Sequence, residues 1–201
     1  MNHTIVITTA WLAWCTVHSV LIAPFWMRWM RRLLGARIAY YRLFYDLFSV
    51  ASLVPLFLLE RRMPGELLFA WSFPLSLVQW TMLLAGLALM VAGGRQYNQR
   101  YFFGLQQIAD ARAGRIEQPA VFKAEGILRR VRHPYYTAGI LIVLFLGNIT
   151  TVTIATKAVL ILYFIVGTLL EERKLVAEFG EEYRTYQREV PMLVPRWRRK
   201  G

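Results

Sequence analysis

Long stretches without a charged side chain dominate the chain, and shorter basic segments separate them. Residues 1–27 and 67–94 contain no Lys, Arg, Asp or Glu, and residues 43–59 contain only Asp46. A helix needs about 20 consecutive apolar residues to cross a bilayer, and each stretch comes close to or exceeds that length. The pattern therefore predicts three transmembrane helices, with Pro74 near the start of the third.

The last apolar stretch is long enough to fold back on itself. Residues 134–156 also lack Lys, Arg, Asp and Glu, and the apolar character resumes after Lys157. Gly147 and Asn148 are turn-forming residues in the middle of this stretch, so we expect a helical hairpin there. These patterns predict an all-α integral membrane protein with about five transmembrane helices, forming a single membrane domain over residues 1–201.

Composition supports a membrane location and explains the charge. Hydrophobic residues make up 57% of the chain, more than a soluble domain usually has. Basic residues outnumber acidic ones by 24 to 12, which could indicate nucleic-acid binding. However, 21 of the 24 lie in three segments that border the predicted spans, 25–42, 95–133 and 171–201. The positive-inside rule predicts a cytoplasmic location for these segments and for the C-terminus, with the N-terminus outside. We therefore expect no nucleic-acid partner.

The predicted hairpin brings two charged clusters to one face of the membrane. The segment RRVRHPYY precedes it, and the pair Glu171-Glu172 follows it. A chain that folds back returns to the face it left, even if the first helix of the hairpin is too short to cross. Two carboxylates at the end of an apolar helix need cationic partners, because the helix dipole is negative there. Either Arg173, Lys174 or the arginines of 129–132 pair with them, or a zwitterionic ligand lies between the clusters.

The order of these residues resembles a known superfamily of membrane methyltransferases. Residues 85–195 resemble the C-terminal half of the isoprenylcysteine carboxyl methyltransferases, and the phospholipid methyltransferases share the paired glutamate. The N-terminal half, with CTVHSVLIAP and YFFGLQQI, looks more like the branch of denitrification-associated membrane proteins and methanethiol S-methyltransferase. The matching elements in the C-terminal half are Arg132-His133-Pro134-Tyr135-Tyr136, Glu171-Glu172, Phe179-Gly180, Tyr183, Tyr186, Val190-Pro191 and Pro195.

This resemblance implies a methyltransferase that uses S-adenosylmethionine, with a lipophilic or small thiol or carboxylate as methyl acceptor. After the three spans of residues 1–94, residues 95–201 would form the cofactor site on the cytoplasmic side of a bacterial or archaeal plasma membrane. Gly93-Gly94 falls where the phospholipid enzymes carry a glycine motif, although helix capping also explains it. The residues expected to bind the cofactor are Gly126, His133, Pro134, Tyr135, Tyr136, Glu171 and Glu172.

Arg132 and His133 are the expected catalytic residues. Each suits one of the two classes of methyl acceptor. A carboxylate acceptor needs only an orienting cation, such as Arg129, Arg130 or Arg132. A thiol must lose its proton or have its pKa lowered, which either a histidine at the interface or a nearby positive charge can bring about. We expect no metal ion in the site.

His18 and Asp46, together with Arg129, are candidates for the acceptor end of the site, since ionisable groups in apolar helices are often functional. An interhelical hydrogen bond would also explain His18. A local ion pair with Arg42, four residues earlier, would explain Asp46.

Two other functions remain open from the sequence. A membrane reductase of related architecture would bind NADPH, whose 2'-phosphate favours a more basic pocket. A non-enzymatic membrane factor of the denitrification-associated type could retain the ligand site without the reaction. The bilayer and the methyl acceptor are the expected partners, and the oligomeric state stays open.

Overall fold

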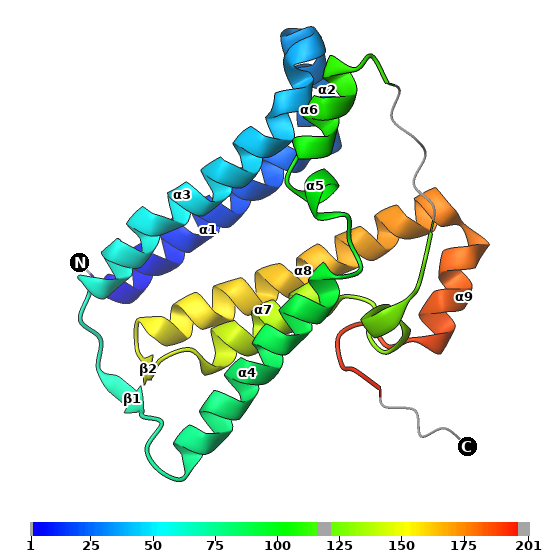
Figure 1. Cartoon of the computed structure of the whole chain (residues 1–201). Coiled ribbons are helices and arrows are strands. Elements are labelled where there is room, and N and C mark those ends of the chain that lie inside the picture. The colour runs from blue at the N-terminus through cyan, green and yellow to red at the C-terminus, as the bar shows by residue number, and fades with distance from the viewer. Residues whose placement is uncertain (1, 116–121, 197–201) are drawn as a thin grey trace, which may run out of the picture. The chain divides into compact units, whose positions relative to one another are not determined.

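The computed structural model describes residues 2–115 and 122–196 and is mainly helical (Figure 1). Its contacts divide the chain into two compact units. The first comprises the described residues within 1–66, 97–119 and 151–156, and the second those within 67–96, 120–150 and 157–201. The third predicted span therefore groups with the C-terminal hairpin. The expectation of a single membrane domain stays a prediction.

The first unit is built on two long helices that lie side by side, α1 (His3–Ile22) and α3 (Tyr41–Arg61) (Figure 1). Trp11 is completely buried in this unit, and its indole N–H donates to Glu60 on α3. Four shorter helices complete it. They are α2 (Pro24–Leu34), the 3-10 helix η1 (Gly35–Tyr40), α5 (Gln99–Phe102) and α6 (Leu105–Arg112).

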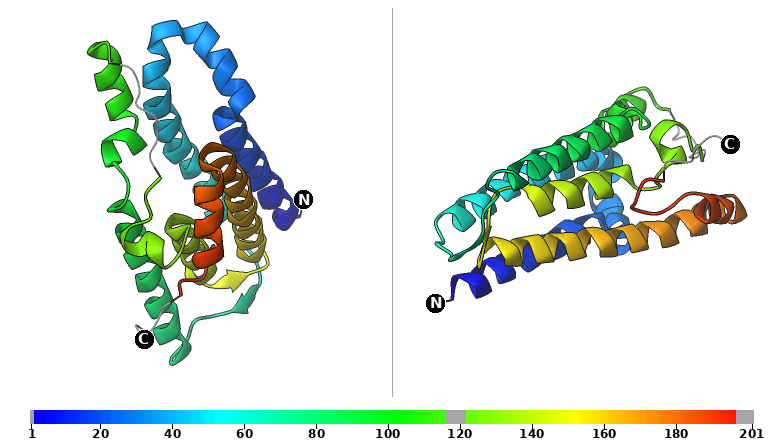
Figure 2. Two further views of the ribbon diagram at one scale, coloured as in Figure 1. Left: turned by 90° about the vertical axis from the view of Figure 1, so that its right-hand side faces the viewer. Right: turned by 90° about the horizontal axis from the view of Figure 1, so that it is seen from below.

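The second unit is built on α4, which packs along α7, and on most of α8 (Figures 1 and 2). Small residues allow close contact between these helices, as is common in membrane proteins. A Cβ on Gly139 of α7 would lie 2.9 Å from the ring of Phe164 on α8. The elements of this unit are β1 (Leu67–Phe69), α4 (Leu75–Gly94), η2 (Gly126–Arg129), α7 (Pro134–Phe145), β2 (Ile149–Thr150), α8 (Thr153–Phe179) and α9 (Glu181–Glu189).

Four helical segments within the described residues are long and apolar enough to cross a membrane: His3–Ile22, Pro24–Arg61, Leu75–Gly94 and Thr153–Phe179. The other predicted span, α7, has 12 residues. Such a helix rises about 18 Å, well short of the roughly 30 Å of a bilayer core. Four of the described helical segments are therefore long enough to cross, against the prediction of about five. The exact number of spans and their orientation stay predictions.

Two boundaries differ from the sequence prediction. The predicted helix start near Pro74 is confirmed, because α4 begins at Leu75. Residues 67–69, at the beginning of the charge-free stretch assigned to the third span, form strand β1, which pairs antiparallel with β2. The fold is thus not purely α-helical. Helix α8 also continues beyond Glu171-Glu172 to Phe179, because EERKLVAEF consists mainly of good helix formers. Gly180, with a positive φ of 59°, follows its last residue.

The predicted turn of the hairpin is confirmed, and side chains cap the helix that leads into it. Helix α7 ends at Phe145, and Gly147 follows with a φ of 65°. The buried ammonium of Lys157 on α8 donates to the carbonyls of residues 143, 144 and 146 at 2.7, 3.2 and 2.7 Å. Gln79 of α4 donates to the carbonyl of Phe145 at 2.9 Å. The last carbonyls of the short helix are therefore hydrogen-bonded without water.

Candidate functional site

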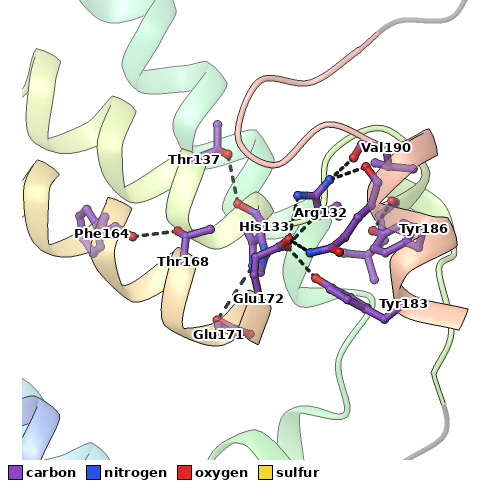
Figure 3. A network of polar contacts seen from close by, with 12 residues as sticks. Arg132, His133, Thr137, Phe164, Thr168, Glu171, Glu172, Tyr183, Tyr186 and Val190 are labelled. Atoms are coloured by element: carbon purple, nitrogen blue, oxygen red, sulfur yellow. Dashed lines mark hydrogen bonds and ion pairs between the residues drawn. The ribbon is translucent and has the colours of Figure 1, made fainter. Parts of the chain in front are cut away.

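Arg132 and Glu172 form a buried ion pair in the second unit (Figure 3). Arg132 lies just before α7, which begins with Pro134, and Glu172 lies on α8. Nε and Nη2 of Arg132 donate to the two carboxylate oxygens of Glu172 at 2.9 and 2.8 Å. This two-point contact is the most specific arrangement of a guanidinium and a carboxylate. The hairpin therefore brings the two predicted charged clusters together, and they pair with each other.

His133 completes the pair from the same side of the hairpin. Its Nε2 lies 2.6 Å from Oε1 of Glu172, an oxygen that also accepts hydrogen bonds from Arg132 and Tyr183. A carboxylate oxygen with these donors accepts and does not donate, so Nε2 carries a proton. Nδ1, the other ring nitrogen, lies 3.9 Å from Oε2 of Glu171. In a neutral imidazole Nδ1 is therefore the basic nitrogen.

Helix α9 supplies two more donors to Glu172. The hydroxyl of Tyr183, 1% exposed, donates to Oε1 at 2.7 Å, and the amide of Gln187 donates to Oε2. Burial, and then the hydrogen bond to the carboxylate, raise the pKa of Tyr183, so its hydroxyl stays a donor. Tyr183 was expected only as a matching element of the resemblance, and neither residue was predicted to have a role in the site. Their separation by four positions, which places them on one face of a helix, is the signal that could have revealed them.

The end of α9 and the segment after it hold Arg132 in place. Nη1 of Arg132 donates to the carbonyls of Gln187, at 3.1 Å, and of Val190. The backbone N–H of Arg132 donates to the carbonyl of Pro191 at 3.0 Å, and the backbone N–H of His133 donates to the carbonyl of Met192 at 3.2 Å. The guanidinium thus makes four hydrogen bonds within the protein, which suits it to positioning Glu172.

Several residues that were predicted to bind the cofactor pack against neighbouring helices or against His133. A Cβ on Gly93, near the end of α4, would lie 3.2 Å from Pro134, which is itself buried. The ring of Tyr136 lies 5.7 Å from that of His133, edge to face. Tyr135 is partly buried beside the Gly93 position. These contacts place Pro134 and the tyrosines around His133 and do not test their binding of a cofactor.

The two neighbouring glutamates differ sharply in exposure. The side chain of Glu172 is 9% exposed, whereas that of Glu171 is 40% exposed. Glu172 accepts hydrogen bonds from four side chains, those of Arg132, His133, Tyr183 and Gln187. Figure 3 shows Glu171 on the opposite side of Glu172 from Tyr186 and Val190. Of the two carboxylates, Glu171 is therefore the more accessible to a ligand.

A polar groove of about 680 Å³ lies beside this network. Two predicted site residues, Gly126 and Arg129, line it. Gly126 has a φ of 53°, a left-handed backbone conformation that strains residues with a side chain, so glycine is favoured there. The lining also includes two cations, Arg130 and Arg196, and the carboxylate of Glu189. Its remaining residues are Ala124, Tyr186, Val190 and Pro191.

The candidates in the first unit have local partners. Nε2 of His18 lies 2.8 Å from the hydroxyl of Tyr45 on α3, which is an interhelical hydrogen bond. Asp46 lies 3.4 Å from Nε of Arg42 in an i,i+4 ion pair. Both structural explanations considered for these residues are thus present. Their roles at an acceptor site stay predictions.

The polar network combines a guanidinium, an imidazole, a phenol, an amide and carboxylates. Imidazoles and carboxylates are also common metal ligands. Across residues 2–115 and 122–196, however, no group of three or more His, Cys, Asp or Glu side chains is placed to hold a metal ion. The expectation that the site holds no metal stays a prediction.

The apolar helices and the polar network at the end of a helical hairpin define an α-helical integral membrane protein. Residues 6–198 match the profile described as NnrU protein. The chain belongs to the NnrU protein family. This confirms the resemblance to the membrane methyltransferase superfamily and its denitrification-associated branch.

Curated relatives have one activity in their names. The chain is 32% identical over 182 residues to methanethiol S-methyltransferase 1 of Bradyrhizobium diazoefficiens, covering 90% of this chain and 63% of that protein. It is 31% identical over 131 residues to methanethiol S-methyltransferase of Crocosphaera subtropica, covering 65% and 48%. For the protein of the same name from Pseudomonas deceptionensis the identity is 30% over 182 residues, covering 90% and 69%. The chain thus spans less than two thirds of the first two relatives. No solved structure matches it at a significant level.

Proposed function

We propose that this chain is an integral-membrane methyltransferase that uses S-adenosylmethionine and methylates a small thiol. The family membership and the names of the relatives support methyl transfer and a thiol acceptor. The observation that carries the proposal is the buried network of Arg132, His133 and Glu172. It orients one imidazole nitrogen beside the exposed Glu171, at the end of a membrane hairpin.

The residues of the polar groove fit the charges of S-adenosylmethionine. The amino-acid part of this cofactor carries a carboxylate and an ammonium, and it supplies a methyl group that its sulfonium already activates. Arg129, Arg130 and Arg196 offer cations for a carboxylate, and Glu189 offers an anion for an ammonium. The groove volume falls within the range of small-molecule pockets. We therefore assign the polar end of the cofactor to this groove.

Glu171 is the carboxylate that we assign to a cationic or hydroxyl group of a ligand. Its side chain is 40% exposed, and its Oε2 lies 3.9 Å from Nδ1 of His133. Glu172 cannot take this role without losing bonds to Arg132 or the other donors, which would leave a buried charge unpaired. Glu172 instead holds His133 in one orientation.

The hydrogen bonds that Arg132 already makes within the protein favour a thiol over a carboxylate as the methyl acceptor. Its guanidinium is committed to Glu172 and to two carbonyls, so it is poorly placed to orient an acceptor carboxylate as well. A thiol must lose a proton as it reacts, because the thiolate is the nucleophile. We assign the acceptance of this proton to Nδ1 of His133, with Arg132 and Glu172 as positioning residues.

Location and sidedness complete the proposal. The basic segments 95–133 and 171–201 carry both halves of the site, and the positive-inside rule places such segments in the cytoplasm. S-adenosylmethionine is available there, while a small or lipophilic acceptor can arrive through the bilayer. We propose a prokaryotic plasma membrane as the location.

Ligand binding to the purified, detergent-solubilised chain tests this function. Melting temperature is measured with S-adenosylmethionine, S-adenosylhomocysteine or NADPH added separately, because a ligand that binds the folded state stabilises it. We expect both adenosyl sulfur compounds to raise the melting temperature and NADPH to leave it unchanged. Stabilisation by NADPH alone would support the reductase alternative and contradict the proposal. Binding without any methyl transfer to thiols would support the non-enzymatic alternative.

A further inference from the structure

Helix α2 separates its charged and apolar side chains completely. Successive residues of a helix lie about 100° apart. On that spacing Arg28, Arg31 and Arg32 occupy one side of α2. The remaining positions after Pro24 are apolar, with three aromatic rings among them, and fill the other side. A short helix with cations on one face and aromatic and aliphatic groups on the other is typical of a helix that lies in the membrane interface.

Much of α2 is exposed. None of its 11 residues, all of which the structure describes, is fully buried, although Trp26, Met30 and Leu34 are partly covered. Phe25, Trp29 and Leu33 are 58%, 51% and 62% exposed. A soluble environment would not favour three large apolar side chains on one exposed helix face. Insertion of this face among lipid tails accounts for their exposure.

The length of α3 also leaves α2 outside the bilayer core. Helix α3 has 21 residues. It rises about 32 Å, which is enough by itself to cross the roughly 30 Å of the hydrocarbon core. Residues 43–59 are its uncharged part apart from Asp46, so the arginine-bearing α2 lies at the lipid headgroups. Gly35, with a φ of 51°, separates α2 from α3.

An apolar groove adjoins α2 within the same unit. It has a volume of about 510 Å³ and is formed by α2, η1 and the first turns of α3. Arg37 is its one charged lining residue. Residues 24–41 contain four arginines and no aspartate or glutamate. The groove is thus apolar with one cation in its lining, and the other arginines lie on the neighbouring side of α2. Its lining residues are Met30, Leu34, Arg37, Tyr40, Tyr41 and Phe44.

We propose that α2 and this groove form a binding site for an anionic phospholipid. The groove takes part of an acyl chain, and the arginines of α2 and η1 bind the phosphate and an anionic headgroup. Charge complementarity selects this occupant. A zwitterionic phospholipid would bring a cation close to an unbalanced set of arginines, whereas an anionic one neutralises them. Each basic side chain near an anionic lipid surface contributes about 1 kcal/mol.

Competition between lipids for the purified full-length chain tests this site. The protein in detergent is mixed with equal amounts of phosphatidylglycerol and phosphatidylcholine, and native mass spectrometry measures the ratio of the two that stays bound. We expect the wild-type chain to retain phosphatidylglycerol preferentially. The double substitution Arg31→Gln/Arg32→Gln should lower that preference by at least about fivefold. Inorganic phosphate at the same concentration should not displace the lipid.

Two matched controls separate a defined site from general surface charge. Arg61→Gln/Arg62→Gln removes the same charge from two adjacent exposed arginines at the end of α3 and should keep the preference. Leu34→Trp fills the groove and should reduce lipid retention, whereas Leu58→Trp, at an exposed position on α3 outside it, should not. Equal losses in both arginine variants, or none in Arg31→Gln/Arg32→Gln, would overturn the proposal. A groove variant that retains lipid normally would overturn the acyl-chain assignment.

Discussion

The guanidinium of Arg132 and the carboxylate of Glu172, 40 residues apart in the chain, meet in a two-point ion pair that is about nine-tenths buried. His133, Tyr183 and Gln187 add hydrogen bonds to the same carboxylate. The pair joins the start of α7 to α8 and to the segment after α9. It therefore fixes the end of the hairpin that carries the proposed site.

Breaking the Arg132–Glu172 pair should cost far more stability than breaking an exposed pair. Removal of one partner from a buried ion pair typically costs about 3–5 kcal/mol, because the other charge is left unpaired. We expect Arg132→Ala and Glu172→Ala each to lower the melting temperature strongly, and the double variant to lose less than the sum. The exposed pair of Arg188 and Glu181 on α9, 3.0 Å apart, is the matched control and should show little coupling. Additive effects of Arg132→Ala and Glu172→Ala would contradict the observed contact.

Tyr183→Phe should destabilise the protein more than Tyr186→Phe does. Tyr183 donates to a carboxylate, a bond worth about 1.5–3 kcal/mol, whereas Tyr186 donates to the backbone carbonyl of Leu128, worth about 0.5–1.5 kcal/mol. The melting temperature at neutral pH measures both. Equal decreases in melting temperature would show that the hydrogen bond from Tyr183 to Glu172 contributes no more stability than the bond from Tyr186 to the backbone.

The same substitution should change the alkaline pH dependence of stability. The pKa of Tyr183 is raised in the folded state, so the unfolded chain ionises first, from about pH 10 upward. The stabilising contribution is complete below that pH and is lost as pH rises further. Melting temperatures between pH 8 and pH 11.5 should therefore fall less steeply for Tyr183→Phe than for the wild type.

Lys157→Met should weaken the hairpin although it adds an apolar side chain to an apolar helix. The ammonium of Lys157 binds three carbonyls at the end of α7, and each buried group left unpaired costs about 1–3 kcal/mol. Lys174→Met removes an exposed lysine from the same helix and is the control. We expect a lower melting temperature for Lys157→Met only. An increase for this variant would show that the lysine is a cost to the fold.

Glu171→Gln should reduce the affinity for S-adenosylhomocysteine, measured by calorimetry. Loss of one charged hydrogen bond predicts a decrease of about tenfold or more. Glu189→Gln should have a comparable effect if the polar groove holds the amino-acid part of the ligand. Glu178→Gln, at an exposed position on α8, should bind like the wild type. Normal binding by both Glu171→Gln and Glu189→Gln would mean that the cofactor contacts lie elsewhere.

Charge-free runs and turn residues were sufficient to predict the long helices and the hairpin. Such patterns reflect the length of a bilayer and the chemistry of a turn, and both are local in sequence. The strand at residues 67–69 was missed because it also lacks charge, and its pairing with residues 149–150 is not local. The side chains that bind the end of α7 could not be predicted, because Lys157 and Gln79 come from other helices.

The composition of the site was harder to predict than its location. The sequence placed Arg132, His133 and the two glutamates at one end of the hairpin, and the structure brings them together there. It could not distinguish Glu171 from Glu172, because neighbouring helical residues point about 100° apart and only packing decides which is buried. The roles of Gln187 and of the carbonyls after α9 depend on a helix that comes later in the chain.

Direct measurement of methyl transfer tests the central claim. Purified chain in lipid nanodiscs is incubated with methyl-labelled S-adenosylmethionine and methanethiol, and labelled dimethyl sulfide is quantified beside reactions with prenylcysteine and fatty acid acceptors. We predict labelled product from the thiol, with a rate about 100-fold or more lower for His133→Gln, which keeps a donor to Glu172 but lacks a basic nitrogen. Absence of labelled thioether from the wild-type chain, or an unchanged rate in His133→Gln, would contradict this account.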